Sequence, residues 1–128
     1  MSAEVSSTNG SGQAQQTELA ELSNAMVRIY KEQFGRGPTK ARTGYAGPNT
    51  IVSTLEESMT AAERNMVKRG AYLRVTETRL WFQEATREEF MNTVEAITGR
   101  KVRAFMSGMD SYADVSVETF CLEPVAQV

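Results

Sequence analysis

The segment from Gly35 to Pro48 limits the folds open to this chain, because four glycines and two prolines interrupt the pattern before it. Upstream, apolar residues recur at steps of three and four, which is typical of one buried helix face: Leu19, Leu22, Met26, Ile29 or Tyr30, and Phe34. Gly35 follows the last of these, where a left-handed cap favours a residue without Cβ, and Pro38 cannot continue a helix. We therefore predict a helix over 17–34 that ends at Gly35.

Two β-hairpins are predicted from turn sequences that lie between strand-like segments. The first joins TKARTGYA to TIVSTLEE through GPN, and the second joins KVRAFM to DVSVETFCL through SGMDSYA. Proline, glycine and asparagine favour the backbone angles of tight turns. The second strand of each hairpin alternates between its two faces, which indicates a sheet with one side toward a core.

Two capping boxes, TAAE from Thr60 and TREE from Thr86, predict the starts of two further helices. The later helix is expected to end at Gly99. The helix from Thr60 has two apolar sides, although Gly70 lies within it and favours a bend or a break. One side holds Ala62, Met66, Leu73 and Leu80, and the other holds Val67, Ala71, Val75 and Phe82.

This order of elements predicts an α+β fold in a single domain, in which an antiparallel sheet of two hairpins packs with three helices in the order α-β-β-α-α-β-β. Strands do not alternate with helices one by one, which argues against a doubly wound sheet. We assign the domain to residues 17–124. Residues 1–16 are rich in Ser, Gly, Gln and Asn and are predicted to be a disordered tail, and residues 125–128 a short C-terminal tail.

A helix with two apolar sides needs cover on both, and two arrangements provide it. Either the helix is enclosed within its own domain, or one side forms a homodimer interface. The predicted interface includes Val67, Ala71, Val75, Trp81 and Phe82. Trp81 is its candidate anchor, with an ordinary core position as the alternative.

The chain lacks the side chains that most often indicate catalysis. It has no histidine, so the commonest general base and metal ligand are both missing. Its single cysteine, Cys121, lies in an apolar strand pattern, which favours a buried structural thiol. Asp110 and Asp114 flank a turn and are expected to make turn hydrogen bonds. We therefore expect no enzyme activity, no metal and no cofactor.

Arg36, Lys40 and Arg42 cluster in the turn-rich segment, and with Arg103 they form the candidate ligand-binding set. The sequence GRGPTK lacks the spacing of a nucleotide-binding P-loop, and it follows a helix instead of preceding one. An anion-attracting surface and ordinary solvated cations are the two interpretations. Three further cations are expected to project from the helix side that also holds Val75 and Phe82, and this mixture fits a partner surface as well as a nucleic-acid surface: Arg64, Lys68 and Arg79. No zinc-ligand set or RNP-like aromatic motif indicates nucleic-acid binding.

The order and spacing of GRGP, TAAE and TGRKV, with TRLWF and the ending ITGRKVRAFMSGMDSYADVSVETFCLEP, resemble the MpsC-like family over residues 19–124. The resemblance implies an α+β domain associated with a membrane potential-generating system, in gene neighbourhoods that include inorganic-carbon uptake components. It provides no catalytic residues. No apolar run reaches the ~20 residues of a membrane span and no leader sequence is evident, so we expect a cytoplasmic protein without direct membrane insertion.

Two functions follow from these observations. The first is an accessory or regulatory protein, a homodimer that contacts a membrane bioenergetic or bicarbonate transport complex. The second is a sensor of anions or nucleotide-like ligands that uses the basic set.

Overall fold

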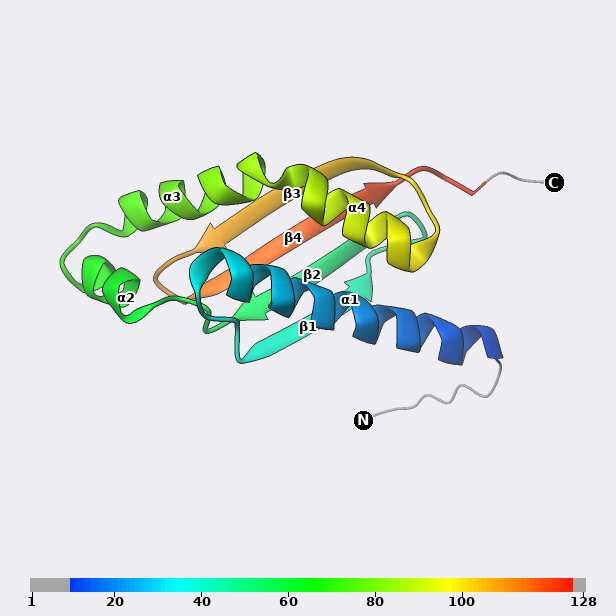
Figure 1. Ribbon diagram of the computed structural model, residues 1–128, viewed down its shortest axis with the longest axis horizontal. Coiled ribbons are helices and arrows are strands. Elements are labelled where there is room, and N and C mark those ends of the chain that lie inside the picture. Colours follow the sequence, from blue (N-terminus) through cyan, green and yellow to red (C-terminus); the bar gives the residue numbers. More distant parts are fainter. Residues whose placement is uncertain (1–9, 126–128) are drawn as a thin grey trace.

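The computed structural model describes residues 10–125. Within this range, four strands form one antiparallel sheet in the order β1-β2-β4-β3. All four helices lie on one side of this sheet (Figure 1). The elements are α1 (Gly10–Phe34), β1 (Lys40–Tyr45), β2 (Thr50–Glu56), α2 (Ala61–Lys68), α3 (Tyr72–Ala85), α4 (Arg87–Thr98), β3 (Val102–Asp110) and β4 (Val115–Leu122). The predicted α+β class and both hairpins are confirmed.

The two faces of the sheet differ in what covers them. In the central strands, residues such as Ile51, Leu55 and Phe120 are buried against the helices, and their neighbours along each strand are only half-buried. We call the side away from the helices the open sheet face; it consists of the even-numbered residues of β1 and β2, the even-numbered residues of β3 from Ala104 onward, and the odd-numbered residues of β4. Val102 lies before the register shift in β3 and belongs to the core. Among residues 10–125, no helix lies against this face.

The hydrophobic core lies between the sheet and helices α1 and α4. Helix α1 contributes Met26 and Ile29, and α4 contributes Phe90 and Val94, all fully buried. Phe90 stacks on Phe105 of β3 at 5.1 Å between ring centroids. Burial of each such side chain contributes about 1.5–3 kcal/mol, so this layer fixes both helices on the sheet.

Helix α1 begins at Gly10, earlier than the predicted start at Thr17. Residues 10–16 of the predicted disordered tail are therefore helical, and the alanine and glutamines there have good helix propensity without needing burial. The rest of that tail, residues 1–9, and residues 126–128 of the C-terminal tail lie outside the described residues. The predicted end is confirmed, since Gly35 has a φ of 78° and donates its N–H to the carbonyl of Lys31.

The long helix predicted from Thr60 is two helices, because the chain turns at Gly70, whose φ is 89°. The capping box at Thr60 is confirmed: its hydroxyl accepts from the Glu63 N–H, and the Glu63 carboxylate accepts from the Thr60 N–H. The capping box predicted at Thr86 is wrong. The Thr86 hydroxyl donates to the Phe82 carbonyl and accepts from the Gln33 side chain of α1, so the tertiary contact replaces the local cap.

Candidate functional site

The predicted ligand-binding cations lie in two separate places. The Arg36 guanidinium donates to the carbonyls of Glu57 and Met59 at 2.7 and 2.8 Å, which joins the end of α1 to the loop after β2. Lys40 and Arg42 lie on β1, whereas Arg103 is an exposed residue of β3, at the opposite edge of the sheet. The structure therefore does not bring Arg103 together with the other three.

Two of these cations have loose carboxylate neighbours. The Lys40 ammonium nitrogen lies 4.0 Å from a carboxylate oxygen of Glu57, and a guanidinium nitrogen of Arg42 lies 3.9 Å from a carboxylate oxygen of Glu56. Exposed pairs at such distances contribute about 0–1 kcal/mol. The carboxylates reduce the local positive charge, so this end of the sheet is a mixed surface.

The predicted dimer residues do not share one surface. Val75 is only 2% exposed and packs inside its own chain, so it is a core residue of α3. Val67 and Ala71 are half-buried. The predicted line assumed one continuous helix, and the break at Gly70 changes the direction of the residues after it.

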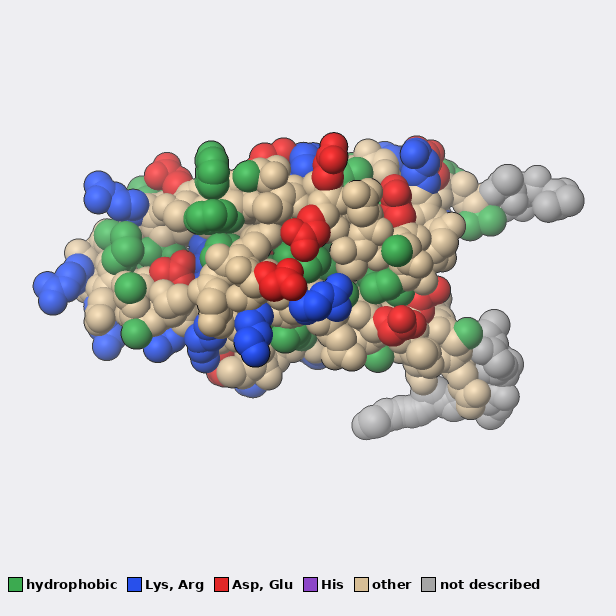
Figure 2. Space-filling view, viewed as in Figure 1, with side chains coloured by type: hydrophobic (Ala, Val, Ile, Leu, Met, Phe, Trp, Pro, Cys, Tyr) green, Lys and Arg blue, Asp and Glu red, His purple; other side chains and the backbone are tan. Residues whose placement is uncertain are grey.

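Helix α3 exposes the larger apolar side chains of this region, which we call the α3 apolar surface: Leu73, Trp81 and Phe82. Their exposed fractions are 60%, 65% and 37%. Trp81 packs edge-on against Phe82, with 5.1 Å between ring centroids. In Figure 2, hydrophobic side chains reach the surface over α3 among charged groups. Exposure of a tryptophan is typical of a surface that contacts another protein.

The buried side of α3 is mostly polar, and sequence reasoning missed it. Val75, Arg79 and Gln83 recur every four residues and are at most 2% exposed. Arg79 was expected on the surface. The four-residue spacing from Val75 to Arg79 and Gln83 was the available signal that they share one helix face. A search for apolar residues does not reveal it, because two of the three are polar and are buried with hydrogen-bond partners.

Arg79 is held by a carboxylate, a backbone carbonyl and a ring. Its guanidinium makes two hydrogen bonds of 2.7 Å to the Glu63 carboxylate and donates to the Ser58 carbonyl at 2.9 Å. It also lies 3.8 Å from the centre of the Phe34 ring. Burial raises the pKa of Glu63, but hydrogen bonds from Arg79 and Thr60 outweigh it and leave that pKa below its usual value. We call these residues the Arg79 cluster.

One turn along α3, Gln83 belongs to a second set that we call the Glu118 cluster. Glu118 of β4 is fully buried and accepts hydrogen bonds from the Tyr30 hydroxyl, the Gln83 amide at 3.0 Å and the Ser107 hydroxyl. Each partner is neutral. Burial raises the pKa of Glu118 to about 7, although these hydrogen bonds oppose the rise. Glu118 is therefore a carboxyl group that changes charge near neutral pH.

Burial and the Glu118 charge raise the pKa of Tyr30 well above its ordinary value, so its hydroxyl stays a donor. The side-chain amide oxygen of Gln83, Oε1, is buried without a hydrogen-bond partner. The cluster thus holds a proton-binding group with an unused acceptor beside it. Because Glu118 has 0% exposure, a substrate in solution does not reach it.

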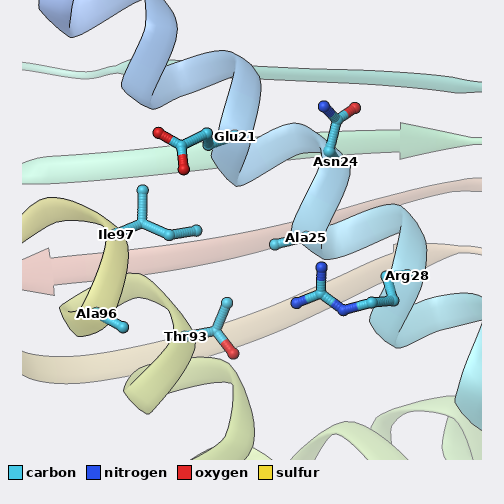
Figure 3. Close-up of a pocket in the computed structure, with 7 residues that line it drawn as sticks. All are labelled: Glu21, Asn24, Ala25, Arg28, Thr93, Ala96 and Ile97. Carbon is cyan, nitrogen blue, oxygen red and sulfur yellow. The ribbon is translucent and has the colours of Figure 1, made fainter.

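A groove of about 420 Å³ lies between α1 and α4. Figure 3 shows the Arg28 side chain extending from α1 into this groove, with Thr93 and Ile97 on the α4 side. It holds one cation, Arg28, and one carboxylate, Glu21. A single cation opposed by a carboxylate is a weak anion site.

Two further findings concern metals and membranes. Within residues 10–125, no three acidic, cysteine or histidine side chains come close enough to hold a metal ion. In the same part of the chain, no helix combines the length and apolar character of a membrane span. Cys121 is half-buried on the open sheet face and forms no disulfide.

The fold and its clusters define a two-layer α+β domain with a buried titratable carboxyl and an exposed apolar helix side. The chain belongs to the MpsC family, described as Na+-translocating membrane potential-generating system (MpsC), whose sequence profile matches residues 14–124. The resemblance that we identified from GRGP, TAAE and TGRKV is thereby confirmed. Comparisons with curated proteins and with solved structures give no match.

Proposed function

We propose that this protein is a non-enzymatic accessory or regulatory protein of the cytoplasm. It acts as a homodimer and contacts the proteins of a membrane bioenergetic or inorganic-carbon (bicarbonate) transport system. The family description supports the association with a membrane system. The α3 apolar surface is the observation that supports action by protein contact.

Trp81 and Leu73 are mostly exposed, so a partner that covered them would remove apolar surface from water, which favours binding. Tryptophan is among the residues whose burial dominates the energy of protein interfaces. Glu77 is exposed on the same helix, and Glu84 forms an exposed ion pair with Arg87 at its end; these residues provide a polar rim. A partner with an apolar pocket of about tryptophan size and basic groups around it would fit this side of α3.

The chemistry of the site supports a role without catalysis. Burial raises the pKa of Glu118 to about 7, and this carboxyl is fully enclosed. The chain has no histidine to act in its place. The alternative role as an anion sensor has less support, because Arg36 is bonded to backbone carbonyls and Arg103 lies at the far edge of the sheet.

The test is co-purification from native membranes with tagged wild-type protein, Trp81→Ser and a control, Val125→Ser. Val125 is also an exposed apolar residue, at 65%, and it follows β4, outside α3. We expect Trp81→Ser to lower the recovery of membrane transport proteins about tenfold, equivalent to ~1.4 kcal/mol, and Val125→Ser to leave it unchanged. Equal recovery with wild type and Trp81→Ser would contradict contact through α3.

A further inference from the structure

The centre of the open sheet face carries β-branched side chains, and its two edges carry charged, large or glycine residues. Val52 and Thr54 of β2 and Val117 and Thr119 of β4 occupy its centre, and all four are half-buried. Faces of this composition pack against other sheets at a separation of about 10 Å. The face is therefore suited to a second sheet.

The strand register arranges this face in rows that cross all four strands. In one row Lys40 of β1 aligns with Glu56, Val115 and, on β3, Asp110. The next row runs from Arg42 on β1 to Gly108 on β3.

A third row runs from Gly44 on β1 to Met106 on β3. The first row thus has opposite charges at its two ends. Each of the other two rows has a large side chain at one end and a glycine at the other. The two edges of the face are complementary to each other.

Consider a second copy placed against the open sheet face and related to the first by a two-fold axis. If the axis runs between the two sheets, parallel to the strands and level with the gap between β2 and β4, the complementary edges of the two copies meet. This rotation places β1 of one copy over β3 of the other and keeps each row in register. Lys40 then faces the partner's Asp110, and Gly44 faces the partner's Met106. Twist between aligned sheets shifts the edges by a few ångströms, which long side chains span.

The space beside Gly44 supports this pairing independently. A groove of about 340 Å³ lies there, lined by Arg42, Gly44 and Val52 among others. A Cβ atom added to Gly44 would meet no atom within 4 Å. At the other end of the same row, Met106 is 52% exposed. Methionine adapts to irregular gaps, so the partner's Met106 is a suitable side chain to fill this groove.

We propose that the open sheet face binds a second copy of this chain, sheet on sheet, with the Lys40/Asp110 and Gly44/Met106 pairs at both edges. The proposal rests on the homodimer of the proposed function and assigns it a surface. It leaves α3 free for a different protein. Four strands of about seven residues cover on the order of 450 Å² per copy, which is at the small end of specific interfaces. We therefore expect a micromolar dissociation constant.

The experiment is sedimentation velocity from about 1 to about 200 µM on wild type, Gly44→Met, Met106→Ala and the double variant. Gly44→Met fills the groove in each copy, so the two Met106 side chains lose their places. We expect the dissociation constant to rise at least ~10-fold, and the double variant to restore it to within about threefold, because the large and small residues have exchanged edges. Circular dichroism checks folding, and Trp81→Ser is the control that leaves the dimer intact.

Three outcomes would overturn the proposal. A wild-type chain that is monomeric at about 200 µM would remove the homodimer, while the membrane-protein contact tested by co-purification would stand. A dimer lost in Trp81→Ser but kept in Gly44→Met would move the interface to α3. Failure of the double variant to restore association would remove the pairing of the two edges.

Discussion

The Arg79 cluster and the Glu118 cluster lie one helical turn apart along α3, yet they balance charge in different ways. The Arg79 guanidinium meets the Glu63 carboxylate in a two-bond ion pair, so opposite charges are buried together. Glu118 has only neutral hydrogen-bond partners. Burial raises the pKa of both carboxyls, but Glu63 is only partly buried, and its hydrogen bonds from Arg79 and Thr60, together with the charge of Arg79, outweigh burial; the neutral hydrogen bonds of the fully buried Glu118 do not.

The two clusters consequently respond to pH in opposite directions. The pKa of Glu63 is lowered on folding, so its contribution to stability is present above the usual carboxyl range and is lost as pH falls. The pKa of Glu118 is raised to about 7, so the folded state binds its proton more tightly. Stability therefore falls as pH rises from about 4.5 to about 7, and the loss is complete above that range.

The largest expected effect comes from Arg79→Ala. The change leaves the Glu63 carboxylate without its cation and removes the contact with the Phe34 ring. We expect the free energy of unfolding at pH 7 to fall by about 3–5 kcal/mol, as for other broken buried ion pairs, measured by urea denaturation. Arg74→Ala, at an exposed position of the same helix, is the control and should change stability by less than ~0.5 kcal/mol. Similar losses in both variants would show that the Arg79 pair adds little.

Glu118→Gln isolates the uncompensated carboxyl, because it keeps the shape of the side chain and removes the charge. At pH 8 we expect the variant to be more stable than wild type by about 3 kcal/mol, since the buried charge is gone. At pH 5 the two should agree within ~1 kcal/mol, because Glu118 is then already protonated. Parallel stability curves from pH 5 to pH 8 would mean that Glu118 does not titrate in this range.

A smaller effect is expected from Tyr30→Phe, which removes one donor to the Glu118 carboxylate. Loss of this hydrogen bond should cost about 1 kcal/mol at neutral pH. It should also raise the pKa of Glu118 further, because the tyrosine hydroxyl favours the ionised form. The pH at which stability declines, followed by thermal unfolding, should move upward. If this pH moved downward instead, the tyrosine hydroxyl would be stabilising the protonated form of Glu118, which would contradict the prediction.

Local sequence signals were enough to predict the sheet and most helix ends. Alternation in 50–56 and 115–122 matches the observed burial, and Gly35 and Thr60 have the conformations that their positions required. Thr86 shows the limit of a local motif, since a hydrogen bond from Gln33 on a distant helix replaces the expected cap. A propensity for breaking at Gly70 was visible in the sequence, but its positive φ depends on how α2 and α3 pack.

The candidate site was much harder to predict, because its residues are polar and come from separate elements. Tyr30, Gln83 and Glu118 belong to α1, α3 and β4, and only the fold brings them together. Hydrophobic periodicity treats such residues as surface, and this misplaced Arg79. Their burial depends on partners that no short sequence window contains.

The strand order leaves β1 and β3 as the two edges of the sheet, and free edges attract further strands. At the β1 edge, Lys40 and Arg42 place positive charge along a short strand. At the β3 edge, the register shift between Val102 and Ala104 interrupts regular pairing beside Arg103. Charges and bulges of this kind oppose strand addition in natural sheets. Both edges thus carry features that oppose the addition of a further strand, and they lower the tendency of crowded copies of this protein to extend one another's sheets.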